Sequence, residues 1–165
     1  FSLKLTKLVR DEAGEKIVSI TGTTKERLKS VVRQLLDEAD TEGWGVPEIT
    51  SKLYKEVGKN LIGNGYARAR AIAQTEMISA SNQASSFAAA STGYETRKFW
   101  STSGLPNIRD SHLEAERISN ERDGLKMDET FPMLGGTPML YPGDPNGDAK
   151  DVIGCRCSIL HEIVW

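Results

Sequence analysis

The sequence predicts an α+β protein. Its N-terminal part is helical and includes one long helix, and its C-terminal part combines a small antiparallel sheet, a short helix and a Pro-rich loop. Three observations support this prediction. Apolar residues recur at helical spacing before residue 58. Residues 66–91 contain no Gly or Pro and are dominated by Ala. After Gly93 the pattern changes to short aromatic and β-branched stretches separated by turn signals.

The first 22 residues predict an extended arm or a hairpin, because two weakly alternating stretches flank a turn signal at Asp11–Gly14. Residues 23–92 are expected to form a helical region. Pro47 opens its second, short helix, since proline is well tolerated in the first turn. The first helix is indicated by apolar residues that share one helix face: Leu28, Val31, Val32, Leu35, Leu36 and Ala39.

The long helix predicted over residues 66–91 carries many small side chains, which would let another backbone approach closely. Gly93 suits the left-handed residue that often follows a helix. We expect this helix to pack centrally and to bury Ile72 and at least one of Met77 and Phe87.

Residues 93–165 are expected to form an α+β core, as one compact unit with the long helix. Residues 94–100 predict a strand, Asn107 is placed to cap a short helix, and Val152–Trp165 has the composition of a terminal strand. Four prolines between residues 132 and 145 leave room only for turns and short strands, so this segment is expected to lie across the surface.

The composition excludes several classes of protein. With 21 basic and 23 acidic residues among 165, the net charge is −2, and no cluster of Lys or Arg marks a nucleic-acid surface. Contact with DNA is therefore expected to be weak at most. No apolar run approaches the roughly 18 residues of a membrane span, and the first residues lack the features of a signal peptide. The first residue is Phe1 rather than Met, which indicates a fragment.

Cys155 and Cys157 are a candidate half of a metal site. Residues two apart on a strand project from the same face, with Cα atoms about 6.6 Å apart, so both thiolates can bind one tetrahedral zinc. His112 is a better third ligand than His161, which lies about 13 Å past Cys157 on a straight strand. The other interpretation, two buried free thiols in an inner strand, stays open. Carboxylates considered as the fourth ligand are Asp110, Asp144, Asp148 and Asp151.

Arg109-Asp110-Ser111-His112 places a cation, a carboxylate, a hydroxyl and an imidazole within one turn. Arg109 and His112 are candidate catalytic residues for a phosphodiester, with the imidazole as general base and the guanidinium stabilising charge. One helical turn does not aim all four side chains at one atom, and a structural hydrogen-bonding role is the stronger interpretation. The chain has no Gly-rich phosphate loop and no Gly-x-Ser-x-Gly.

Six short motifs follow one another along the chain. They are Arg68-Ala69 with Ile72–Glu76, Ala80–Ala84, Lys98-Phe99-Trp100-Ser101-Thr102, Arg109-Asp110-Ser111-His112, Phe131 with Gly135-Gly136 and Tyr141–Pro145, and Cys155-Arg156-Cys157. In this order they resemble the phage head morphogenesis proteins typified by the F protein of phage Mu, the Mu F-like minor head (capsid) proteins of tailed phages. The resemblance covers about residues 47–165. Two positions depart from the family pattern: Asn107 stands near the place where an Asp is common, and Gly154 where an Asn is common.

The resemblance implies a structural role rather than an enzymatic one. It implies a minor capsid protein inside the virion near the portal vertex, which is present in the host cytoplasm during assembly. Its expected partners are the portal protein and other head proteins, with weak or transient contact with packaged DNA and no membrane. Aid to head morphogenesis and to DNA delivery follows from the same resemblance. The alternative is an enzyme, a nuclease or an ADP-ribosyltransferase-like toxin domain that uses Arg109 and His112.

Overall fold

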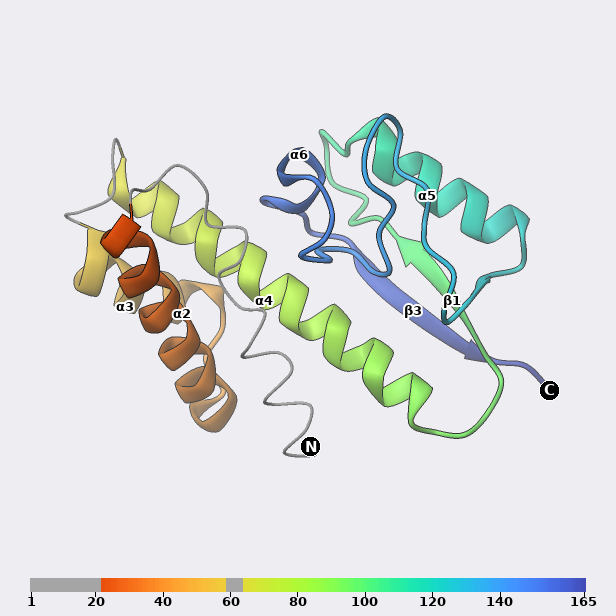
Figure 1. The fold of residues 1–165 in the computed structure, drawn as a ribbon, viewed down its shortest axis with the longest axis horizontal. Coiled ribbons are helices and arrows are strands. Elements are labelled where there is room, and N and C mark those ends of the chain that lie inside the picture. Colours follow the sequence, from red (N-terminus) through yellow and green to blue (C-terminus); the bar gives the residue numbers. More distant parts are fainter. Residues whose placement is uncertain (1–21, 59–63) are drawn as a thin grey trace. The chain divides into compact units, whose positions relative to one another are not determined.

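The computed structural model describes residues 22–58 and 64–165. The arm or hairpin predicted over residues 1–22 lies outside them, except for Gly22, which begins the first described helix. The chain divides into two compact units, the first ending at Met77 and the second comprising Ile78–Trp165. The division falls inside the long helix α4 (Gly65–Ala90), coloured yellow to green in Figure 1. Among the described residues, no helix is long and apolar enough to cross a membrane.

The first unit contains α2 (Gly22–Glu42), α3 (Val46–Val57) and the start of α4. Four of the six residues predicted on the apolar face of α2 are buried, and the other two, Val31 and Leu36, pack against the same core at partial burial. At the start of α3 the Glu48 carboxylate accepts a hydrogen bond from the Gly45 N–H, which satisfies one amide before the first turn. The buried core comprises Leu28, Val32, Leu35, Ala39, Ile49, Leu53, Val57, Ala69 and Ala73.

Small and polar side chains, rather than large apolar ones, form the buried side of α4. The prediction that Ile72 and one of Met77 and Phe87 are buried is wrong, because all three are only partly buried. Ile72 and Met77 pack against the first core at partial burial. Farther along α4, a Cβ added to Gly143 would lie 3.1 Å from the Ser79 Cα, so no large side chain fits between the two backbones at that point. Gly93 follows the helix with a φ of +77°, which confirms the predicted helix end.

The second unit is built on a three-stranded antiparallel sheet in the order β2-β1-β3. The strands are β1 (Thr96–Ser101), β2 (Leu125–Lys126) and β3 (Ser158–Ile163). The strands β1 and β3 lie side by side in Figure 1, with Trp100 opposite Ile159. The predicted α+β fold with one long helix and a small antiparallel sheet is therefore confirmed.

Two helices accompany this sheet, α5 (Asp110–Glu121) and the single turn α6 (Ala149–Val152). The helix predicted after Asn107 is α5, but Asn107 does not cap it. The N-cap residue is Arg109, and Asn107 instead takes a φ of +67° two residues earlier. Neither β2 nor α6 was predicted, because each is too short to show a period in the sequence.

The Pro-rich segment does not lie across the surface as predicted. Phe131 and Met139 form an isolated antiparallel bridge, and both side chains are fully buried. Tyr141–Asp144 is buried as well. This segment supplies part of the second core because the sheet is too small to enclose an apolar interior by itself. That core comprises Trp100, Ala115, Leu125, Phe131, Met133, Met139, Tyr141, Val152, Cys155, Cys157 and Ile159.

A candidate metal centre

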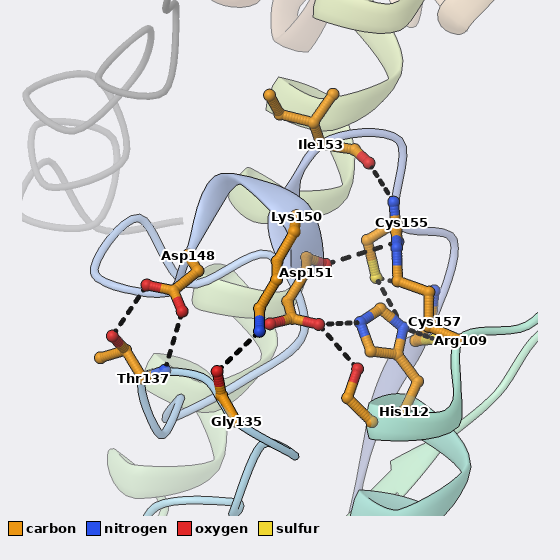
Figure 2. A network of polar contacts seen from close by, with 11 residues as sticks. Arg109, His112, Gly135, Thr137, Asp148, Lys150, Asp151, Ile153, Cys155 and Cys157 are labelled. Carbon is orange, nitrogen blue, oxygen red and sulfur yellow. Dashed lines mark hydrogen bonds and ion pairs between the residues drawn. The ribbon is translucent and has the colours of Figure 1, made fainter.

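His112, Cys155 and Cys157 meet inside the second unit. The first turn of α5 carries His112, and the two cysteines lie between α6 and β3. The His112 Nδ1 atom is 3.3 Å from the Cys157 Sγ and 3.9 Å from the Cys155 Sγ. All three residues are buried, with exposed fractions of 2%, 1% and 3%. The cysteines precede β3 rather than lying on it as predicted, but both sulfurs still face the same imidazole (Figure 2).

These distances fit three corners of a zinc tetrahedron. Zinc binds thiolate sulfur at about 2.3 Å and imidazole nitrogen at about 2.05 Å, which places N and S about 3.6 Å apart at a tetrahedral angle. The two observed N···S distances bracket this value. The three ligand atoms also lie within 4.8 Å of one another. The buried group could therefore hold a metal ion.

The electrostatic environment favours one thiolate at this group. A hydrogen bond from Cys155, with further contributions from His112 and the Trp100 indole, lowers the pKa of Cys157 to about 5. The same hydrogen bond, followed by burial, raises the pKa of Cys155. The Cys157 backbone N–H also points at the Cys155 Sγ, 3.4 Å away. A metal ion would take the place of the shared proton and would stabilise both sulfurs as thiolates.

On its other side, His112 faces a carboxylate. The Asp151 Oδ1 lies 3.9 Å from the His112 Nε2 and accepts a hydrogen bond of 2.6 Å from the Ser111 hydroxyl. The Arg109 guanidinium donates to the Ile153 carbonyl at 2.6 Å, which ties the start of α5 to the end of α6. Figure 2 shows the imidazole between Asp151 and the two cysteines. The predicted candidates Arg109 and His112 thus belong to one network, but the arginine contacts backbone carbonyls.

The remaining predicted ligands lie elsewhere. His161 is 3.3 Å from the Ser85 hydroxyl, and burial, followed by the charge of Lys98, lowers the pKa of this histidine. Asp144 accepts the Leu140 N–H within the Pro-rich segment. Asp148 contacts Thr137, and Asp110 is exposed at the start of α5. No carboxylate of the described residues joins the three ligand atoms, and Asp151 approaches only the far side of the ring.

Asn82, on α4, is a structural residue to which the sequence analysis assigned no role. Its Nδ2 donates to the carbonyls of Pro142 (2.8 Å) and Cys157 (3.1 Å), and its Oδ1 accepts the Ile159 N–H at 3.0 Å. One side chain therefore ties the Pro-rich segment, the cysteine pair and β3 together. An Asn within an Ala-rich helix was the available signal, because a polar side chain on a buried helix face needs partners.

Lys98, on β1, acts in a similar way. It is 1% exposed, and its Nζ donates to the carbonyls of Met127 and Leu140, each at 3.0 Å. The same ammonium lies 5.2 Å from the centre of the Phe131 ring. A lysine amid β-forming residues gave no hint of burial, since lysine is seldom enclosed unless it is paired.

The two departures from the Mu F-like pattern share a backbone feature. Asn107 and Gly154 both have positive φ angles, +67° and +69°. Asn and Gly are the residues that tolerate this left-handed region best, so each fits its local conformation. Compared with known proteins, the chain matches no family model, no curated protein and no solved structure.

Proposed function

We propose that this chain is a minor head protein of a tailed phage, a structural component that binds the portal protein and aids head assembly. The observation that supports the proposal is the arrangement of the motifs behind the Mu F-like resemblance. Asn82, Lys98, His112 and the cysteine pair are all buried, and the first two are bonded to backbone groups of distant segments. Residues used in this way hold a fold together, which is what motifs shared by structural proteins are expected to do.

The proposal includes a structural zinc ion held by His112, Cys155 and Cys157. Two sulfurs and one imidazole nitrogen are ligands that zinc prefers, and the N···S distances suit tetrahedral coordination. The ion would join the start of α5 to the segment before β3. Its binding free energy would then contribute to the stability of the second unit.

The enzymatic alternative draws less support from the same network. A nuclease or ADP-ribosyltransferase needs side chains that contact a substrate. His112 is enclosed by Trp100, Asp151 and the cysteines, and the Arg109 guanidinium donates to the Ile153 carbonyl. Both residues serve the packing of α5 against α6 in this arrangement.

Co-sedimentation with the portal protein encoded in the same genome tests the proposed partner. The chain should pellet with assembled cognate portal rings and stay in the supernatant with the portal of an unrelated phage. Binding should persist as salt rises, because the net charge of −2 gives little electrostatic attraction. Absence of co-sedimentation, or equal binding to both portals, would contradict the proposal. A parallel assay with duplex DNA should show weak binding that disappears as salt rises.

The zinc component has a separate test. Elemental analysis of the chain, purified without added metal or affinity resin that leaches metal, should find about one zinc per chain. The variant Cys157→Ser should lose it, and Ser158→Ala, at the exposed neighbouring position, should retain it. A wild-type chain that remains free of metal after incubation with zinc would overturn this component and leave the portal proposal standing.

A further inference from the structure

Two buried polar atoms beside the candidate metal centre, the His112 Nε2 and the Asp151 Oδ2, have no hydrogen-bond partner. The other carboxylate oxygen, Oδ1, lies 3.9 Å from the same Nε2, and both side chains are almost fully enclosed. A buried polar atom is costly when it is unpaired, so the 3.9 Å separation of Nε2 and Oδ1 favours a small movement that completes a hydrogen bond. A shift of about 1 Å brings an oxygen within hydrogen-bond distance of the nitrogen.

We propose that Asp151 is a positioning residue for the metal centre, which accepts the His112 Nε2–H and so leaves the Nδ1 lone pair directed at the ion. This inference rests on the zinc component of the proposed function. A neutral imidazole carries one N–H and one lone pair, and a metal ion takes the lone pair. Since Nδ1 faces the two sulfurs, the proton must be on Nε2 when metal binds. A carboxylate is the strongest acceptor available to hold that proton there.

The surroundings of Asp151 hold its carboxylate in place. The Ser111 hydroxyl donates to Oδ1 at 2.6 Å, and Ser111 precedes His112 in the first turn of α5. The helix that presents the imidazole therefore also orients the carboxylate. The Arg109 bond to Ile153 fixes the far end of α6, two residues after Asp151. Gly136 lies beside the Asp151 carboxylate and leaves room for it, because a Cβ added to Gly136 would lie 2.8 Å from Oδ2.

The experiment compares Asp151→Asn with wild type and with Asp148→Asn. Asp148 is the control because it lies on the same short segment but contacts Thr137. Zinc affinity is measured by competition with a chromophoric chelator, and the protonated nitrogen of His112 by ¹H–¹⁵N NMR. We expect Asp151→Asn to bind zinc about 10–100-fold more weakly and Asp148→Asn to bind it as wild type does. In zinc-loaded wild type, the proton of His112 should be on Nε2.

The outcomes separate this inference from the zinc proposal. If wild type binds zinc and Asp151→Asn binds it equally well, Asp151 has no positioning role. If wild type binds no zinc but the Nε2 proton depends on Asp151, the zinc component falls and the positioning of His112 stands. If the proton in the metal-loaded chain is on Nδ1, the inference is overturned. Should Asp151→Asn fail to fold, the zinc affinity of Ser111→Ala is measured instead. We expect Ser111→Ala to bind zinc more weakly than wild type, by a smaller factor than Asp151→Asn. An unchanged zinc affinity would count against the inference.

Discussion

Substitution of Asn82 by Ala should destabilise the second unit more than truncation of an exposed polar side chain does. The change removes one side chain but leaves three backbone groups of other segments without partners: the carbonyls of Pro142 and Cys157 and the N–H of Ile159. The side chain is 5% exposed, so water enters poorly to replace it. Each of these bonds contributes about 1–1.5 kcal/mol, and we expect a total loss of about 3–5 kcal/mol.

Urea unfolding followed by near-ultraviolet circular dichroism measures this loss, and native-state hydrogen exchange at the Ile159 amide reports it locally. The control is Asn120→Ala, the same substitution at an exposed position of α5, which should change stability by less than about 0.5 kcal/mol. A loss below about 1 kcal/mol in Asn82→Ala, with the Ile159 amide still protected, would refute the reasoning. Asn82→Asp should be equally harmful at neutral pH, because its two oxygens would face carbonyl oxygens where an amide now donates.

Three further results are expected. If the centre holds zinc, a chelator should lower the melting temperature of wild type and leave that of Cys157→Ser unchanged; equal melting curves for wild type with and without chelator would contradict this. Burial lowers the pKa of Lys98 to about 8 from 10.5. The folded state then binds fewer protons than the unfolded chain between these values, so stability relative to Lys98→Met should rise by up to about 3 kcal/mol from pH 8 to 10.5. A flat difference in urea titrations would show that burial does not lower the pKa of Lys98. Leu53→Ala, at a fully buried position of α3, should cost about 2–5 kcal/mol by thermal or urea unfolding, whereas a cost near zero would show that the first core is loosely packed.

The predictable part of the fold was the part with local periodicity. The apolar face of α2 appeared in the sequence because helical spacing alone decides which side chains point inward. The Pro-rich segment was misplaced for the opposite reason. Burial of Met139 and Tyr141 depends on the sheet being too small to enclose a core, and local pattern carries no information on sheet size.

The candidate metal centre was predictable in its ligands and not in its surroundings. Residue type selected His112 and the cysteine pair, because thiols and imidazole are uncommon and chemically distinctive. Asp151 was one of four carboxylates that the sequence offered equally as a fourth ligand. Only the fold showed that it lies beside the imidazole. Asn82 was visible as part of a motif, but its three partners lie 60 or more residues away and none of them is a side chain.

The pairing of β1 with β3 has a consequence for the order in which the second unit forms during synthesis. Trp100 pairs with Ile159, 59 residues later in the chain. At roughly 5–20 residues per second, a ribosome takes about 3–12 s to make the intervening stretch. During that time α5 and β2 can already dock on β1, while its other edge has no partner. The nascent chain therefore presents an open strand edge for seconds, and this interval is where a chaperone or a second nascent copy would compete with β3.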